Sequence, residues 1–127
     1  MCPESAVVPR DKFDLAAASA AAHAGWPAIE QFAEQLLKWV QDPNWPVAQV
    51  LAPVLASVGA PLAPYVRQVL GGEDETWKYH LIETVVSRSP ELSAVLRLDL
   101  ERIAFHPSLS ERSEAVASVA LAALERP

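Results

Sequence analysis

The sequence predicts an all-α fold, a short right-handed α-solenoid of about three antiparallel helix pairs preceded by an N-terminal capping helix. Three observations predict it. Apolar residues recur at spacings of three and four through most of the chain, as they do on the buried face of an amphipathic helix. No segment alternates between polar and apolar residues for long enough to indicate a strand. Turn residues recur at equal intervals, since Trp45 and Trp77 lie 32 residues apart, as do Asp42 and Asp74.

The first two helices are delimited by residues that start and stop helices. Asp14 is placed to cap a short alanine-rich helix at 15–24, and Gly25 is placed to end it. The segment 26–40 then repeats apolar residues at three and four, with charged residues on the opposite face. This pattern predicts an amphipathic helix of about four turns.

The third helix is expected over 45–59. Asn44 is a suitable N-cap, and a proline in the first turn, as at Pro46, is compatible with a helix start. The segment has almost no charge, which indicates burial on most sides. Pro53 lies inside it and is expected to bend the helix or remove one of its hydrogen bonds.

The second half of the chain repeats the same signals. Asp74, Ser89 and Ser108 each precede a periodic apolar segment, where a side-chain oxygen caps a helix. Glu111 follows Ser108 by three residues, the spacing of a capping box. The helices predicted here are 61–72, 75–89, 90–105 and 109–126.

These helices group into pairs of about 30 residues within one domain, 1–127. Pro61 and Pro90 open corresponding helices of successive pairs. A repeat made of two antiparallel helices is typical of an α-solenoid, in which each pair buries its apolar face against the next. The expected repeats are 26–59, 60–89 and 90–126.

Two resemblances narrow this interpretation. The unit "LLKWVQDPNWPVAQVLAPVLASVG" resembles a HEAT repeat, with a leucine-rich first helix, an Asp-containing turn, and Val and Ala in the second helix. The strings "VPRDKFD", "DPNWP", "GAPLAP" and "DETWKY" resemble the motifs of a family of small bacterial proteins known only as a domain of unknown function. This similarity covers the chain from about Val8 to Val116. It implies a helical-repeat fold and a role as an immunity or antitoxin partner, and it brings no activity with it.

Composition limits the function classes. The 127 residues carry a net charge of −6, with acids spread over both halves. Such a surface repels nucleic acids and anionic lipids and favours a basic protein partner. The single cysteine, Cys2, cannot form an internal disulfide, and the chain has no good signal peptide or run of about 18 apolar residues. We therefore expect a cytoplasmic protein that binds neither nucleic acid nor membrane.

No pattern in the sequence points to catalysis. His23, His80 and His106 are isolated, without the spacing of a metal site. His80 and Glu83 share a helix face, a spacing that is common by chance. We expect no catalytic residue, no metal and no cofactor, and so a protein that is not an enzyme.

The turns inside successive repeats are the better candidates for a site, since a solenoid aligns them along one edge. Acids beside aromatic residues suit a basic partner, because the acids steer it and the aromatic rings supply contact area. The alternative is that Asp42 and Asp74 only cap helices, while Trp45 and Trp77 only wedge between repeats. The predicted partner-binding residues are Asp42, Asn44, Trp45, Glu73, Asp74, Glu75, Trp77, Lys78 and Tyr79.

The leading hypothesis is a protein-binding module, such as a bacterial immunity protein that neutralises a basic toxin. The alternative is a HEAT-like scaffold with nucleic-acid or ligand-modifying activity. The distribution of the arginines argues against it, because they are interleaved with acids rather than gathered in a basic field. A structural adaptor in a larger assembly is a third hypothesis. The sequence leaves the oligomeric state open.

Overall fold

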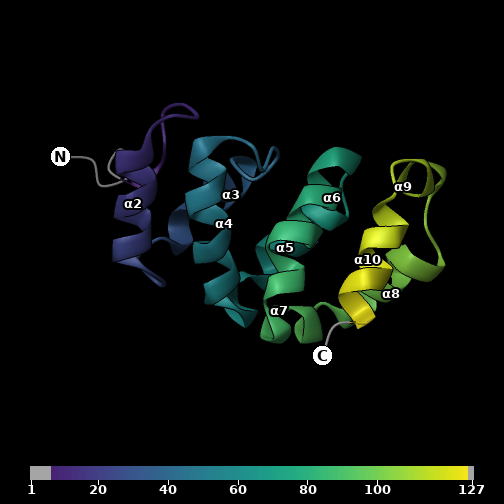
Figure 1. Cartoon of the computed structure of the whole chain (residues 1–127). Coiled ribbons are helices and arrows are strands. Elements are labelled where there is room, and N and C mark those ends of the chain that lie inside the picture. The colour runs from purple at the N-terminus through teal and green to yellow at the C-terminus, as the bar shows by residue number, and fades with distance from the viewer. Residues whose placement is uncertain (1–6, 126–127) are drawn as a thin grey trace.

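The computed structural model describes residues 7–125, and this part of the chain is helical without any strand (Figure 1). The all-α prediction is confirmed, while Cys2 lies outside the described residues. The α-helices are α2 (Leu15–Ala24), α3 (Ala33–Lys38), α4 (Pro46–Val58), α5 (Ala63–Leu70), α6 (Glu75–Thr84), α7 (Pro90–Val95), α8 (Arg97–Phe105), α9 (Leu109–Ser113) and α10 (Val116–Glu125). Three 3-10 turns, η1 (Glu30–Phe32), η2 (Ala60–Leu62) and η3 (Val86–Arg88), join some of them.

Helix starts follow the side-chain caps that the sequence predicts. The carboxylate of Asp14 accepts a hydrogen bond from the backbone of Ala17, and Ser89 caps α7 in the same way. Ser108 and Glu111 form both hydrogen bonds of a capping box at α9. Each cap satisfies backbone N–H groups that have no partner within their own helix.

Asn44 does not cap α4 as predicted. Trp45 occupies the N-cap position with an extended backbone and no side-chain cap. The backbone N–H of Val47 instead donates to the carbonyl oxygen of Lys12 at 3.1 Å. The segment that precedes α2 therefore supplies the cap of α4 through its backbone.

Five predicted helices are interrupted. Those expected over 61–72 and 75–89 are each divided between an α-helix and a 3-10 turn, α5 with η2 and α6 with η3. The four-turn helix expected over 26–40 is a 3-10 turn followed by the six residues of α3, with the break at Phe32 (φ −109°, ψ 9°). The helix expected over 90–105 breaks at Leu96, and that over 109–126 breaks at Ala115, whose φ is 63°. The periodic apolar residues remain buried across these breaks, because each break redirects the chain around the same core.

The helices follow one another across the molecule. The second helices of the expected repeats, α4, α6 and α10, form a row with α2 at one end, in which each helix contacts its neighbour (Figure 1). α3 contacts α5, and α8 packs closely on α10. The loops that lead into α4, α6 and α9 lie along the upper side of this view.

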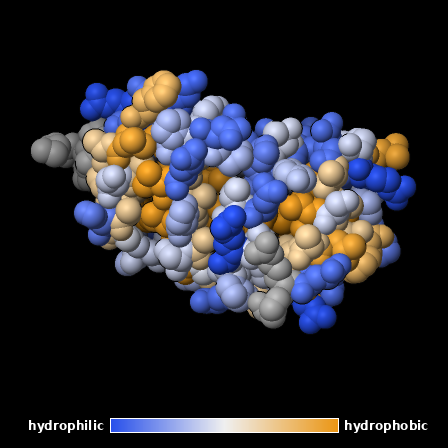
Figure 2. All heavy atoms as spheres, viewed as in Figure 1, coloured by the Kyte–Doolittle hydropathy of each residue, from blue (hydrophilic) through white to orange (hydrophobic). Residues whose placement is uncertain are grey.

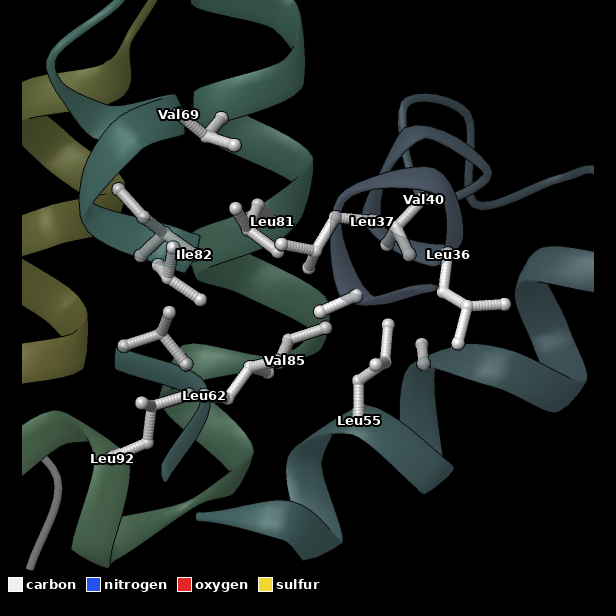
Figure 3. Packing of buried hydrophobic residues seen from close by; sticks show 14 of the residues in the cluster. Leu36, Leu37, Val40, Leu55, Leu62, Val69, Leu81, Ile82, Val85 and Leu92 are labelled. Carbon is white, nitrogen blue, oxygen red and sulfur yellow. The ribbon is translucent and has the colours of Figure 1, made fainter. Parts of the chain in front are cut away.

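One core runs through the row. Leu36, Leu37 and Val40 from α3 and the residues after it meet Leu55 of α4, and Leu81, Ile82 and Val85 continue the cluster toward Leu62 and Leu92 (Figure 3). Nearly all of these side chains are fully buried. Burial of apolar area is the main stabilising contribution to such a fold.

Within the described range, no single helix is both long and apolar enough to cross a membrane. α4 and the segment Ala60–Leu70 reach that length and composition only together, and they are bent by 108° at the break between them.

Candidate partner-binding edge

The first predicted turn lies between α3 and α4 and is held by its own polar groups. The backbone N–H of Asn44 donates to Oδ1 of Asp42 at 2.9 Å, so the Asp42 carboxylate stabilises the turn. The Asn44 side chain is exposed, and Trp45 is half-buried. The Trp45 ring contacts that of Trp39 edge to face, with centroids 5.7 Å apart. Trp45 thus packs on the core and keeps part of its ring at the surface.

The second turn lies between α5 and α6 and carries the run Glu73, Asp74 and Glu75. Glu73 and Asp74 are exposed. Asp74 also caps α6, since its Oδ1 accepts from the backbone N–H of Trp77 at 3.0 Å. The Glu75 side chain turns inward and is only 10% exposed. Of the three acids, two face solvent.

Trp77 joins the second turn to α3. Its indole Nε1 donates to the carbonyl oxygen of Leu37 at 3.0 Å. Trp45 packs against Trp39. Trp45 and Trp77 therefore both contact the short segment 37–39 at the end of α3. Trp77 also lines a pocket of about 200 Å³ between α3 and α5, together with Tyr65, Glu34 and other residues of those helices.

Lys78 does not face solvent. The residue is 3% exposed, and its Nζ lies 2.9 Å from Oε1 of Glu75 and 3.0 Å from Oε2 of Glu111. Arg102 binds the same Glu111 carboxylate through two nitrogens, at 2.6 and 2.9 Å. Lys78 is therefore part of an ionic cluster that we define as Glu75, Lys78, Arg102 and Glu111, and it is not available to a partner.

Glu111 is the centre of this ionic cluster. Burial alone would raise the pKa of its carboxyl group, but the hydrogen bonds from Arg102, from the backbone N–H of Ser108 and from Lys78 lower it to about 2. The hydrogen bond to Glu111 raises the pKa of Arg102. Glu111 and Arg102 are thus both charged throughout the neutral range, and the cluster joins α6 to α8 and α9.

Tyr79 is half-buried, and its ring meets that of His80 edge to face at 5.4 Å. The Nδ1 atom of His80 is buried without a hydrogen-bond partner among the described residues. In the pocket that Trp77 lines, the hydroxyl of Tyr65 donates to Glu30 at 3.1 Å, and burial together with this contact raises the pKa of Tyr65.

The predicted residues thus separate into three groups. Asn44, Glu73 and Asp74 are exposed, Lys78 is buried, and Asp42, Trp45, Glu75, Trp77 and Tyr79 are intermediate. Glu34 and Tyr65 share a pocket with Trp77, and Glu30 binds Tyr65. These neighbours could not be predicted, since nothing in the sequence relates α3 to α5. Sequence reasoning identified Glu111 only as a capping residue and gave no signal for Arg102.

Within residues 7–125, no three His, Cys, Asp or Glu side chains come together in a way that could hold a metal ion. Three arginines in that range, Arg67, Arg97 and Arg102, pair with Asp99, Glu101 and Glu111.

Comparison with known protein families matches residues 7–124 to the family described as a domain of unknown function (DUF5071). No curated protein matches the chain. The match covers almost all of the described residues and includes both turns of the candidate edge.

Proposed function

Since the chain belongs to the DUF5071 family, described only as a domain of unknown function, we propose that it is a protein-binding module made of HEAT-like helical repeats. Its partner in this proposal is a basic protein, bound along the edge formed by the turns that precede α4 and α6. The single domain 1–127 acts as a scaffold that holds these turns side by side.

The packing of the helices supports the repeat arrangement. The second helix of each expected repeat contacts the corresponding helix of the next repeat, α4 with α6 and α6 with α10. α2 packs on α4 at one end, as a capping helix would. A short right-handed solenoid of three antiparallel pairs accounts for these contacts, and its stacked pairs would bring successive turns to one edge.

The observation that carries the proposal is the composition of this edge. Asn44, Glu73 and Asp74 are exposed beside Trp45 and Trp77, which both keep part of their surface accessible. The edge over α4 and α6 is mainly hydrophilic (Figure 2). Acids around partly exposed aromatic rings suit a basic partner, since the charges accelerate encounter and the rings supply contact area. The net charge of −6 acts in the same direction.

An immunity or antitoxin protein that blocks a basic toxin in the cytoplasm fits this description. Nucleic-acid binding is the weaker alternative, because Arg67, Arg97 and Arg102 are each paired with a carboxylate and offer little free positive charge to phosphates. A structural adaptor would use the same edge and differs only in the identity of the partner.

The test compares three baits in lysates of cells that carry the protein naturally. The first is the wild-type chain, and the second carries Glu73→Lys and Asp74→Asn, in which Asn keeps the helix cap. The third carries Glu83→Lys and Glu125→Gln, which make the same change in net charge at exposed positions away from the turns. A basic protein retained by the first and third baits and lost from the second supports the proposal.

Binding of that protein should also weaken as salt is raised, because exposed charges are screened. Equal retention on all three baits would mean that the edge does not recognise the partner. Retention of no basic protein by the wild-type chain would remove the proposal.

A further inference from the structure

The pocket of about 200 Å³ between α3 and α5 is lined by both aromatic and aliphatic side chains. Tyr65 and Trp77 line it, and Leu37 and Val69, which are buried, supply aliphatic surface. Pockets that hold drug-sized molecules have volumes of roughly 300 Å³ or more. This pocket is therefore of a size for one side chain of a partner rather than for a large cofactor.

Both aromatic rings are held in place by hydrogen bonds at their polar ends. The indole N–H of Trp77 donates to the carbonyl oxygen of Leu37 at 3.0 Å, and the hydroxyl of Tyr65 donates to Oε2 of Glu30 at 3.1 Å. Both aromatic residues are half-buried, so part of each remains accessible. A ligand that contacts the rings restricts them little further, because they are already ordered.

Glu34 gives the pocket an accessible acceptor. The residue lines the pocket and is exposed to solvent. The ion pairs found among residues 7–125 use other carboxylates, those of Glu75, Asp99, Glu101 and Glu111. The charge of Glu34 is therefore not neutralised by a cation of the described chain and is open to a ligand.

The charges at the pocket favour a cation. Burial, the hydrogen bond and charge of Glu30, and the charge of Glu34 together raise the pKa of Tyr65. Both carboxylates therefore act at the Tyr65 hydroxyl. Lys38 also lines the pocket, but it is exposed, and its long side chain can keep the ammonium group in water. A cation beside the rings thus meets two carboxylates against one lysine.

We propose that this pocket binds a guanidinium group, and that its natural occupant is an arginine side chain of the basic partner. The assignment of the occupant rests on the proposed function. The guanidinium lies against the rings of Tyr65 and Trp77 and pairs with the Glu34 carboxylate, while its methylene groups contact the aliphatic surface of the pocket. Arginine suits such a pocket better than lysine, because its planar, weakly hydrated head stacks on aromatic rings and can pair with both oxygens of one carboxylate.

The test uses n-propylguanidinium chloride as a mimic of the arginine side chain and follows the indole N–H signals by NMR. The chain has four tryptophans, and each gives one such signal. The signals of Trp77 and Trp45 are assigned by their loss in Trp77→Phe and Trp45→Phe. We expect a saturable shift of the Trp77 signal. The Trp45 signal should stay in place, because Trp45 is not among the residues that line the pocket, and it would move if the salt perturbed the whole fold.

Two further compounds test what the pocket recognises. n-Propylurea has nearly the same planar shape and N–H donors without the charge. n-Butylammonium chloride mimics a lysine side chain and has the charge without the planar head. Each should bind at least about fivefold more weakly than n-propylguanidinium, because each lacks one of the two properties that the rings and the carboxylate select.

Two variants locate the contact. Glu34→Gln removes the carboxylate and should weaken n-propylguanidinium binding by about fivefold, the upper end of what an exposed ion pair contributes. Glu83→Gln changes an exposed acid on α6 that does not line the pocket, and it should leave binding unchanged. Used as baits, Glu34→Gln should retain less of the basic partner than Glu83→Gln. Because Glu34 is exposed, its substitution leaves the core intact.

The absence of a saturable Trp77 shift with n-propylguanidinium, equal binding of n-propylurea, or unchanged binding by Glu34→Gln would overturn the site. Equal or tighter binding of n-butylammonium would overturn the assignment to arginine. Each of these results leaves the proposed function standing if the bait experiment recovers a basic partner. Conversely, a positive titration without such a partner would retain the site and reject its assignment to a partner arginine.

Discussion

The indole N–H of Trp77 donates a hydrogen bond to the carbonyl oxygen of Leu37 at 3.0 Å, across 40 residues of sequence. The bond ties the first turn of α6 to the end of α3. Because the ring of Trp45 packs edge to face against that of Trp39, which follows α3 directly, the bond also links the two turns of the candidate edge to each other. Trp77 has a structural role in addition to any contact with a partner.

Replacing Trp77 with Phe should lower the free energy of unfolding by about 2 kcal/mol, since one hydrogen bond and part of the buried ring are lost. Urea unfolding followed by circular dichroism measures the change. Trp39→Phe is the matched control, because it keeps an aromatic ring against Trp45 and removes no hydrogen bond that is present among the described residues. If both variants lost the same stability, the bond to Leu37 would contribute nothing.

Gly59 and Glu91 form a second long-range contact. Gly59 has φ 75° and ψ −142°, a backbone conformation that is almost restricted to glycine. A Cβ atom there would lie 2.8 Å from Oε2 of Glu91, while Oε1 of Glu91 accepts a hydrogen bond from the backbone of Ala60. The sharp turn after α4 thus depends on the absence of a side chain.

We expect Gly59→Ala to destabilise the protein by about 3 kcal/mol, combining backbone strain with the displaced carboxylate. Gly71→Ala is the control, since its nearest neighbour would be at an ordinary 3.5 Å. In a Glu91→Ala background the clash is gone, so the cost of Gly59→Ala should fall, and a double-mutant cycle measures the difference. An unchanged cost would assign the whole effect to the backbone.

The parts of the fold that sequence reasoning predicted correctly depend on local chemistry. Asp14, Asp74, Ser89 and Ser108 all cap the helices that they were expected to cap, because a cap needs only its own residue and the next three. The breaks at Leu96 and Ala115 have no such signal. Neither is a glycine or proline, and the apolar spacing continues through both breaks, so the sequence predicts unbroken helices.

The candidate site was predictable to a smaller extent. The run Glu73 to Glu75 appears uniform in the sequence, but Asp74 begins a helix, and each helical residue turns by about 100° from the one before. Glu73 and Asp74 therefore point outward while Glu75 turns inward to Lys78. The pairing of Lys78 and Arg102 with Glu111 depends on how α6, α8 and α9 pack, and no local pattern encodes it.

Glu111 should make the stability of the protein depend on acid pH. Its pKa is about 2 in the folded protein against an ordinary 4.5. Above about pH 5 the carboxyl group is charged in both states, and its ion pairs contribute fully to stability. As pH falls from about 5 to about 2, the unfolded state takes up the proton first, and about 3 kcal/mol of stability is lost.

Urea unfolding at a series of pH values from 7 to 2 measures this loss, with Glu111→Gln as the diagnostic variant. At pH 7 the variant should be less stable by about 3 kcal/mol, because Lys78 and Arg102 lose a buried partner. Its stability should then change less between pH 5 and pH 2 than that of the wild type. Glu114→Gln removes an exposed carboxylate nearby and should follow the wild-type profile. A parallel fall in wild type and Glu111→Gln would mean that other carboxyl groups, and not the ionic cluster, determine the response to acid.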